Sequence, residues 1–255
     1  MSDYAAEHFE KLFVLESGHF WFRGRNRIIQ SMLKRFVGDK KKVKMMEIGC
    51  GTGFVLSGLA RFPHFELWGS DLHAEGIACA QKRLPKAHFV QIDFRKTPFK
   101  EEFDVVGAFD VLEHIDEDSA VIHNVHTTLK KDGYFVITVP QHRWLWSTQD
   151  TTAGHKRRYS RNELTHKLRA EGFSVRYVSS FVTALLPIML ISRLRRKKKA
   201  KNHLLPGQEY SYDELNLPRW LNLCLEMGMW IDEFFIRRGL SLPFGGSIIA
   251  VAQKS

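Results

Sequence analysis

The chain has 255 residues, 44% hydrophobic and 12% aromatic, which is enough for one α/β domain with a large core or for two small domains. Its formal net charge of +10 favours an anionic partner, such as nucleic acid, a membrane surface or an acidic small molecule. Cys50, Cys79 and Cys224 cannot all pair and lack metal-ligand spacing, so the composition excludes a disulfide scaffold and no metal site is predicted.

The chain begins with a polar, acidic stretch that lacks the basic start and apolar run of a signal peptide, so we expect a cytoplasmic protein. From Ala5 to Phe36 the pattern predicts one or two helices around the aromatic stretch His19-Phe-Trp-Phe-Arg23. This stretch is too aromatic and too basic for a mere leader. The alternative interpretation is that Phe20 and Phe22 only form the apolar face of a helix.

The next part of the chain alternates strands with helices. Val43 to Ile48 is apolar and predicts a strand, Gly49 to Gly53 a tight turn, and Val55 to Leu59 a helix. The cycle repeats with strands at Leu67–Ser70, His88–Ile92, Val105–Phe109 and Tyr134–Val139 and with helices at Glu75–Leu84, Asp118–Leu129 and Arg161–Ala170. Because right-handed crossovers place helices on both faces of a parallel sheet, this order predicts an α/β, doubly wound fold.

Two further strands are expected near the end of the chain, at Ser174–Ser179 and Ser247–Ala252, which brings the predicted sheet to seven strands. The insertion between them is far longer than a usual connection. It holds an apolar piece, Phe181 to Leu194, a basic run, Arg193 to Lys201, and an amphipathic piece, Trp220 to Arg238.

The turn Glu47-Ile-Gly-Cys-Gly-Thr-Gly53 is typical of a ligand-binding loop, because glycines let a ligand approach the backbone and a following helix offers free N–H groups. A dehydrogenase fingerprint needs a third glycine where Leu56 stands, and a P-loop needs Lys followed by Ser or Thr. Neither pyrophosphate site fits. A ligand held through ribose, amino-acid and adenine parts fits better.

Acidic residues at strand ends support such a ligand. Asp71 ends the second strand about 20 residues after the turn, where a carboxylate can accept hydrogen bonds from two ribose hydroxyls. Asp93 ends the third strand and is placed to face an adenine amino group. Glu47 is an acid within an apolar strand, and its burial would be costly without a donor.

At this point the residues resemble the class I S-adenosylmethionine-dependent methyltransferases, in the type 11 branch that includes the ubiquinone and menaquinone methylating enzymes. The resemblance covers about Val43 to Phe173, and Ser247–Ala252 looks like the family's final antiparallel strand. It implies a Rossmann-like, mostly parallel sheet that binds S-adenosyl-L-methionine and releases S-adenosyl-L-homocysteine. The alternative is a relative that keeps the fold without the cofactor, which the retained acids disfavour.

The resemblance also assigns roles to the motifs. The glycine turn would wrap the methionine part of the cofactor, Asp71 would bind ribose, and Asp93 would approach adenine. Phe109-Asp-Val-Leu-Glu-His-Ile115 looks like the fourth-strand motif that lines the cofactor beside the substrate. The predicted cofactor-binding residues are Glu47, Gly49, Cys50, Gly51, Gly53, Asp71, Leu72, Asp93, Phe94, Phe109, Asp110 and Val111.

The acceptor side is predicted from position. An acceptor that carries a proton at pH 7 needs a base, for which histidine is suited. His114 follows the fourth strand, where ligands bind in open parallel sheets, although it could equally cap or pack the next helix. The loop after the fifth strand, residues 140–159, should close over the acceptor and adds two candidate bases, His142 and His155. The predicted substrate contacts are Trp21 and Arg23, in an N-terminal lid, and Trp144, Trp146, Asp150 and Tyr159.

The basic run has two competing uses. It follows an apolar stretch that is too short to span a bilayer, and the combination is typical of a surface anchor, so Phe181–Lys201 is predicted to contact an anionic membrane. The alternative is a helical cap with a solvated basic loop. RNA binding is disfavoured because the chain lacks the Asn/Asp-Pro-Pro-aromatic motif, a Pro-Cys nucleophile and aromatic residues within the basic run.

We therefore expect one methyltransferase domain over residues 1–255, divided into a helical lid (1–40), a cofactor-binding core (41–180), a helical and basic insertion (181–246) and a final strand (247–255). It would methylate a small, apolar or lipid-linked acceptor, in the cytoplasm or at the inner face of the membrane. RNA methylation and a non-catalytic membrane-surface role are the alternatives. No motif specifies O-, N- or C-methylation or an oligomeric state.

Overall fold

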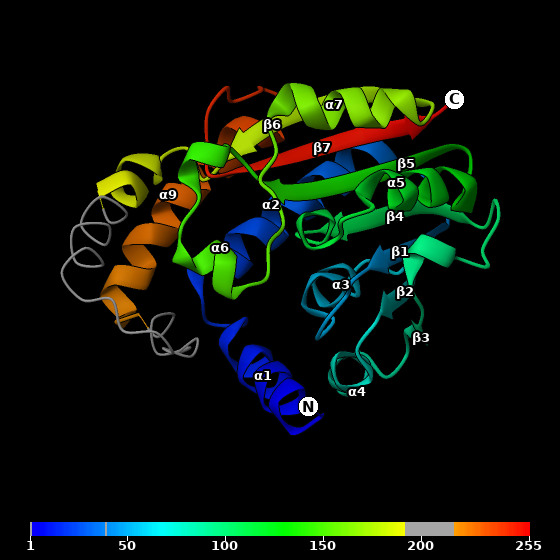
Figure 1. Ribbon diagram of the computed structural model, residues 1–255, viewed down its shortest axis with the longest axis horizontal. Coiled ribbons are helices and arrows are strands. Elements are labelled where there is room, and N and C mark those ends of the chain that lie inside the picture. Colours follow the sequence, from blue (N-terminus) through cyan, green and yellow to red (C-terminus); the bar gives the residue numbers. More distant parts are fainter. Residues whose placement is uncertain (1, 39, 192–216) are drawn as a thin grey trace.

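The computed structural model describes residues 2–38, 40–191 and 217–255 (Figure 1). Within these residues the core is a seven-stranded sheet of order β3-β2-β1-β4-β5-β7-β6. The strands are β1 (Val43–Ile48), β2 (Phe65–Asp71), β3 (His88–Gln91), β4 (Phe103–Phe109), β5 (Leu129–Pro140), β6 (Phe173–Phe181) and β7 (Ser247–Lys254). Only β7 runs antiparallel to its neighbours among these strands. The predicted doubly wound, mostly parallel sheet is confirmed.

Most helices lie where the hydrophobic spacing predicts them, the N-terminal region forms two, and α6, Thr148–Thr152, lies within the stretch predicted as a loop. They are α1 (Ser2–Leu15), α2 (Phe20–Val37), α3 (Phe54–Leu59), α4 (Ala74–Arg83), α5 (Asp118–Thr128), α6 (Thr148–Thr152), α7 (Arg161–Ala170) and α9 (Arg219–Arg237). Short 3₁₀ turns, η1 (Phe94–Lys96), η2 (Leu112–His114) and η3 (Arg143–Leu145), follow β3, β4 and β5. Residues 186–191 are also helical.

Helices cover both faces of the sheet (Figure 1), because successive residues of a strand point to opposite sides. Met45 of β1 packs with α2, α3 and α9 in one apolar cluster, whereas Met46 packs with α5 and α7 in the other. Both side chains have no exposed surface. The two clusters hold the sheet rigidly, so the carboxyl ends of the strands keep a fixed spacing.

The amphipathic piece of the insertion is α9, and it packs along α2. Glu226 of α9 is buried and forms ion pairs with Arg23 (3.2 Å) and Arg27 (2.6 Å) of α2. A Cβ on Gly24 would lie 2.8 Å from Met229, so a glycine is needed where the helices approach closely. The basic run Arg193–Lys201 lies outside the described residues. No helix of the described part of the chain is long and apolar enough to cross a bilayer.

Candidate active site

The glycine turn adopts a backbone that other residues rarely take. Gly49, Gly51 and Gly53 have φ values of 62°, 51° and 73°, all in the left-handed region. A Cβ on Gly49 would lie 2.6 Å from Cγ2 of Val111, so the turn packs directly against the end of β4. The first and fourth predicted motifs therefore meet at one edge of the sheet.

Asp71 fixes the turn to the end of β2. Its carboxylate accepts hydrogen bonds from the backbone N–H groups of Gly51 (2.8 Å) and His73 (2.9 Å), and the residue is 8% exposed. Leu72, the next residue, is 53% exposed and offers an apolar surface beside the turn. Each carboxylate oxygen can accept a second hydrogen bond, so Asp71 can still receive ligand hydroxyls.

Asp93 lies at the same edge, just after β3. It caps η1 by accepting from the backbone N–H of Arg95 (2.9 Å), and the guanidinium of Arg95 pairs with its carboxylate at 2.7 Å. This pairing is the main cause that lowers the pKa of Asp93, which stays ionised. Phe94 is buried beneath it.

Glu47 is the buried acid of the turn. Its side chain lies at the end of β1, is 3% exposed, and its Oε2 has no hydrogen-bond partner. Burial raises its pKa to about 8, and the positive charge of Arg25 only partly opposes this. An unpaired buried carboxyl is costly unless a cation or a donor joins it. The site therefore fits a ligand that carries a positively charged amino group.

The predicted lid position is occupied by α1, which packs on α4. A Cβ on Gly51 would come within 3.9 Å of the ring of Phe9, so α1 lies against the glycine turn. At the end of the helix, Glu16 accepts a hydrogen bond from the hydroxyl of Thr52 and pairs with Arg83 at 2.9 Å. The hydrogen bonds and the ion pair among Glu16, Thr52 and Arg83 thus connect the end of α1, the turn and α4.

Asp110 follows β4 with a positive φ of 58°, and it contacts two elements. Its carboxylate pairs with the guanidinium of Arg25 in α2 and accepts from the hydroxyl of Thr138 (3.2 Å). Trp21 covers Arg25, whose guanidinium lies 4.5 Å from the indole centroid. Arg23, in contrast, reaches Glu226 of α9, which directs it away from Asp110.

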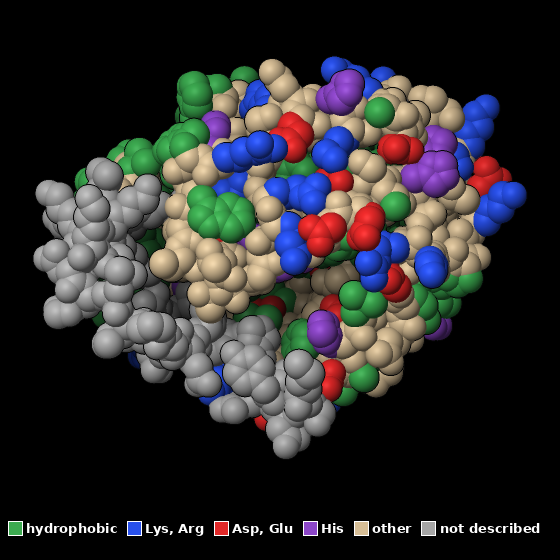
Figure 2. Space-filling model, in the orientation of Figure 1, with side chains coloured by type: hydrophobic (Ala, Val, Ile, Leu, Met, Phe, Trp, Pro, Cys, Tyr) green, Lys and Arg blue, Asp and Glu red, His purple; other side chains and the backbone are tan. Residues whose placement is uncertain are grey.

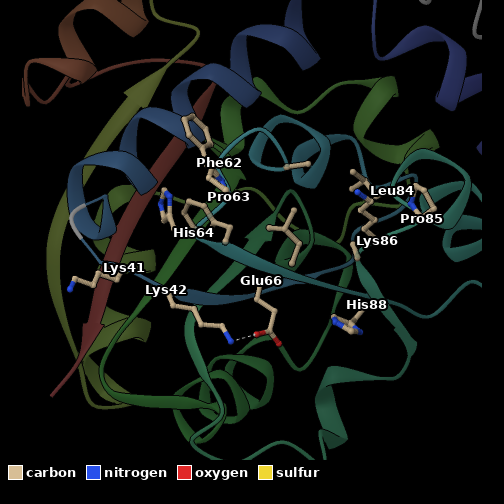
Figure 3. Close-up of a pocket in the computed structure, with 14 residues that line it drawn as sticks. Lys41, Lys42, Phe62, Pro63, His64, Glu66, Leu84, Pro85, Lys86 and His88 are labelled. Atoms are coloured by element: carbon tan, nitrogen blue, oxygen red, sulfur yellow. Dashed lines mark ion pairs between the residues drawn. The ribbon is translucent and has the colours of Figure 1, made fainter.

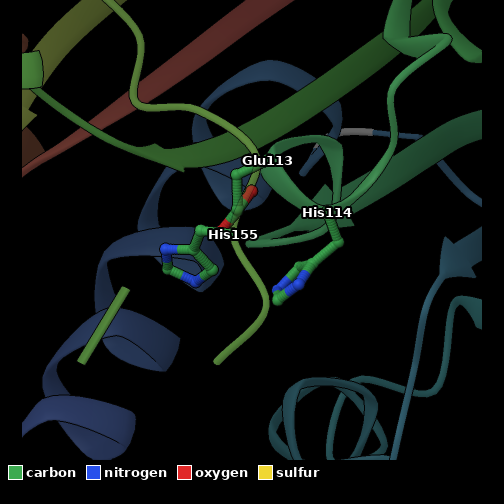
Figure 4. Close-up of side chains that lie close together, drawn as sticks. All are labelled: Glu113, His114 and His155. Carbon is green, nitrogen blue, oxygen red and sulfur yellow. The ribbon is translucent and has the colours of Figure 1, made fainter. Parts of the chain in front are cut away.

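Figure 4 shows Glu113, His114 and His155 close together beyond β4. The rings of His114 and His155 are 4.7 Å apart at 82°. Burial lowers the pKa of His114 to about 4, so its ring is neutral near pH 7. His155 contacts the carboxylate of Asp150 at 3.0 Å, and Arg158 donates to the same oxygen at 2.7 Å.

The loop after β5 contains the remaining predicted residues, and they occupy different environments. Trp144 is 57% exposed, and the indole N–H of Trp146 donates to Thr151 at 3.2 Å. The ring of His142 lies 5.0 Å from that of Trp144 in a tilted arrangement, and its Nε2 is buried without a partner. Tyr159, predicted to line the substrate, lies fully buried instead and donates to the carboxylate of Asp118 at 2.7 Å.

Asp150, also predicted to contact substrate, is 1% exposed and is fully engaged within the protein. Besides His155 and Arg158, it accepts from the backbone N–H (2.8 Å) and hydroxyl (3.0 Å) of Ser147. These bonds lower its pKa despite the desolvation that opposes them. The structure thus brings His114 and His155 together. Tyr159 and Asp150 are buried and form hydrogen bonds that hold the loop in place.

A large groove lies at the opposite edge of the sheet, before the amino ends of β1, β2 and β3 (Figure 3). It has a volume of about 770 Å³, and Lys42 on its rim pairs with Glu66 at 3.3 Å. None of the predicted site residues lines it. Ligands of open parallel sheets bind at the carboxyl ends of strands, so we do not assign the cofactor to this groove.

Positive charge is not gathered into one uniform patch on the face viewed in Figure 2, where Lys and Arg lie beside Asp and Glu. Exposed ion pairs such as that of Lys156 with Asp116 (3.9 Å) also place opposite charges together. A continuous basic surface for a nucleic-acid backbone is therefore not found on this face.

Several residues at the site are not predicted by the sequence reasoning: Glu16, Arg25, Thr52, Arg83 and Glu113. Arg25 belongs to the aromatic and basic stretch before β1, and Glu113 belongs to the fourth-strand motif, so both had a local signal. Glu16 and Arg83 have none, because 67 residues separate them in the chain.

The model of a methyltransferase domain family matches residues 21–178. The ubiquinone biosynthesis O-methyltransferase of Bradyrhizobium sp. (strain ORS 278) is 31% identical over 40% of this chain and 42% of that protein. A probable S-adenosylmethionine-dependent methyltransferase of Mycolicibacterium smegmatis is 25% identical over 63% of this chain and 62% of that protein. The chain thus matches less than two thirds of the length of either curated relative.

Among solved structures, the phosphoethanolamine N-methyltransferase 2 of Haemonchus contortus in complex with S-adenosyl-L-methionine is similar in fold. The TM-score is 0.60 at 20% identity, over 89% of this chain and 52% of that one. This likeness supports the fold alone.

Proposed function

The chain belongs to the methyltransferase domain family, among the class I S-adenosylmethionine-dependent methyltransferases, and we propose that it methylates a small, apolar or lipid-linked acceptor. The family match confirms the predicted class, whose methyl donor is S-adenosyl-L-methionine, the predicted cofactor. When bound, S-adenosylmethionine supplies an electrophilic methyl carbon on a sulfonium. The protein's task is then to hold the acceptor in line with that carbon and to exclude water.

The observation that carries the proposal is the turn between β1 and α3. Three glycines with positive φ shape its backbone, and the carboxyl of Glu47, with one oxygen unpaired, is buried beside it. We assign Glu47 to the amino group of the cofactor's methionine part. Asp71 would accept the ribose hydroxyls, with Leu72 against the nucleoside and Asp93 nearest the adenine amino group.

The acceptor side of the site would be formed beyond β4. We assign His114 and His155 to the acceptor because they lie together at the strand's carboxyl end, next to the turn of Asp110. A pKa near 4 makes His114 a weak base, so it is better suited to orient the acceptor than to take its proton. The exposed indole of Trp144 and the covered indole of Trp21 would contact an apolar acceptor.

An oxygen atom is our preferred methyl acceptor. The Bradyrhizobium relative is an O-methyltransferase of ubiquinone biosynthesis, and 31% identity over 107 residues supports transfer of this chemistry to the present chain. A phenolic, apolar acceptor also suits a site that contains aromatic side chains and the neutral imidazole of His114.

Incubation with methyl-labelled S-adenosylmethionine and a fractionated cell extract tests the proposal. We expect label in the fraction extracted by organic solvent, and none when Asp71→Asn replaces the wild-type protein. Asp132→Asn is the control, because Asp132 is an exposed residue of β5 that lies far along the chain from the turn. Label in the RNA fraction would favour the RNA alternative, and no label in any fraction would contradict methyl transfer.

We further propose that α9 brings the protein to a membrane surface. One side of α9 packs on α2, and the other exposes a stripe of large apolar residues spaced by three or four: Trp220 (68%), Leu223 (53%), Met227 (46%), Trp230 (46%) and Phe234 (50%). Arg237 and Arg238 follow at the helix end. An apolar stripe with basic flanks favours an anionic lipid surface.

Sedimentation with liposomes tests this part of the proposal. The wild-type protein should pellet with vesicles that contain phosphatidylserine, less so at high salt, and Trp220→Ala combined with Trp230→Ala should lower the bound fraction about tenfold or more, since each large apolar side chain contributes ~2 kcal/mol. Val14→Ala, at an exposed apolar position of α1, is the control. Equal pelleting of all three proteins would contradict a role for α9.

A further inference from the structure

Glu113 is a buried acid without a partner. It has no exposed surface, and neither Oε1 nor Oε2 has a hydrogen-bond donor in the described protein. Buried polar groups are satisfied in the great majority of cases, and an unsatisfied carboxyl costs several kcal/mol. Its charged neighbours are the acid Asp110 and the bases Arg25 and Arg158. A cation bound at this position would remove the cost.

Two imidazoles lie at the same place (Figure 4), and one possible ligand atom from each of Glu113, His114 and His155 lies within 4.8 Å of the others. His155 is oriented by Asp150 through Nδ1, at 3.0 Å, which leaves Nε2 free. His114 lies beside the backbone of Gly154 and against the ring of His155. Metal-binding histidines are usually held as His155 is, with the second nitrogen bonded to a carboxylate or a backbone carbonyl.

We propose that Glu113, His114 and His155 bind one divalent transition-metal ion, with Zn²⁺ as the best match. Two imidazole nitrogens and one carboxylate oxygen suit zinc, and they suit magnesium or calcium poorly because those ions prefer oxygen ligands. Zinc at ~2.1 Å from each ligand would place the ligand atoms roughly 3.4 Å apart. Side-chain rotations that move the ligand atoms by about an ångström would bring them to this spacing.

The site would keep one coordination position open, because the chain supplies three ligands and zinc takes four. A metal ion lowers the pKa of an oxygen ligand. On the proposed function, an acceptor hydroxyl at this position would give up its proton to water more readily and present an oxygen anion for methylation. The metal site itself does not rest on that function.

The chain order explains why the sequence analysis predicts no metal here. Glu113 and His114 are adjacent, but His155 follows 41 residues later on a different loop, so no compact spacing of ligands appears. The loop between β5 and α7, held by Asp150 and Arg158, brings His155 back to the end of β4.

Titration of the chelator-treated full chain with ZnCl₂, followed by calorimetry and by elemental analysis of the dialysed complex, tests the proposal. We expect one ion per chain. Glu113→Gln and His155→Ala should each weaken binding by about 100-fold or more, and Asp150→Asn by roughly 10- to 100-fold, because it orients a ligand without touching the ion. His142→Ala, which changes a histidine of the same loop outside the cluster, should bind as the wild type does.

Absence of a stoichiometric ion, or equal affinity in the wild type and Glu113→Gln, would overturn the proposal. Binding of S-adenosylhomocysteine by each variant serves as the folding control and separates the two ideas. Loss of metal binding with intact cofactor binding would leave the proposed function standing. Metal binding without any cofactor binding would overturn the proposed function alone.

Discussion

The site depends on a few residues whose conformation or burial would be unfavourable elsewhere. Gly49 needs a left-handed backbone and has Val111 against it, and Glu47 is buried without a partner for one oxygen. Leaving a buried polar group without a partner costs about 1–3 kcal/mol of folding free energy, and such a cost persists where the group serves a function. Gly49 itself has no such cost, because glycine adopts a left-handed backbone freely, but a residue with a Cβ would be strained there. These features mark the turn as a binding site more strongly than its glycine content does.

The first prediction concerns Gly49. Gly49→Ala adds a methyl group into the side chain of Val111 and also strains the backbone, so we expect the affinity for S-adenosylhomocysteine to fall at least tenfold. Gly172→Ala is the matched control, because Gly172 has a φ of 86° but lies after α7, where its Cβ would meet only the ring of His126. Calorimetric titration of both variants checks this, and an equal loss of affinity would mean that backbone strain alone is responsible.

The second prediction concerns the pH dependence of stability in the cofactor-free protein. The folded pKa of Glu47, about 8, lies above the value of 4.5 for the free side chain, so the folded state favours the protonated form. The stability from this effect is complete below pH 4.5 and is lost as the pH rises through 8. Urea unfolding at pH 5 and pH 8 should show a smaller loss of stability with rising pH for Glu47→Gln than for the wild type.

The outcome that contradicts this assignment is an unchanged pH dependence in Glu47→Gln. Asp71→Asn is a useful comparison, since Asp71 belongs to the same turn but has backbone donors for its carboxylate.

The sequence predicts the placement of the proposed cofactor residues better than that of the proposed acceptor residues. The turn, Asp71 and Asp110 lie at the ends of neighbouring strands, where strand order alone brings them together. The loop residues depend on how residues 140–159 fold. Tyr159 is predicted to contact the substrate, but its side chain is buried and its hydroxyl donates a hydrogen bond to the carboxylate of Asp118.

The elements are positioned by contacts between segments that are distant in the chain. The N-terminus of α2 is capped by His19, whose ring Nδ1 accepts the backbone N–H of Trp21 at 3.3 Å. Asn222 of α9 reaches the same point, accepting from the backbone N–H of Phe20 (2.8 Å) and donating to the carbonyl of Gly18 (2.9 Å). The insertion therefore supports the helix that carries Arg25 to Asp110.

The third prediction tests this cap. Burial lowers the pKa of His19 to about 4, below the value of 6.5 for the free side chain, so the folded state favours the neutral ring. That stability is present above pH 6.5 and is lost as the pH falls toward 4. His19→Asn keeps a good cap without a titrating ring, so it should equal the wild type at pH 8 within about 0.5 kcal/mol and be more stable at pH 5 by on the order of 1 kcal/mol.

Urea unfolding at the two pH values measures this difference. His123→Asn, at an exposed histidine of α5, controls for the general effect of losing a titrating ring. A stability gap between His19→Asn and the wild type that is the same at pH 5 and pH 8 would contradict the cap assignment.

At the level of elements, the hydrophobic spacing predicts the order of strands and helices because each element buries one consistent face. The strand boundaries are less predictable: β2 begins at Phe65 and β5 at Leu129, earlier than their apolar runs suggest, since hydrogen bonding to neighbouring strands extends them over polar residues. The 3₁₀ turns after β3, β4 and β5 have no periodic signal. They depend on local hydrogen bonds such as that of Arg95 with Asp93.

For the whole molecule, the strand order is what makes one site from separate motifs. The glycine turn after β1 lies between the ends of β2 and β4, the strands that carry Asp71 and Asp110. From one side α1 approaches the turn, and from the other α2 brings Arg25. The acidic side chains at this edge are suited to the cationic cofactor.

The most direct measurement of this account is a calorimetric titration of the full chain with S-adenosylhomocysteine. We predict one site per chain in the wild type and in Asp132→Asn, and at least a 100-fold weaker affinity in Asp71→Asn, whose amide cannot accept the backbone N–H groups and the ribose hydroxyls together. Affinity in Asp71→Asn equal to that of the wild type, with both proteins folded, would contradict the assignment of the cofactor to the ends of β1 and β2.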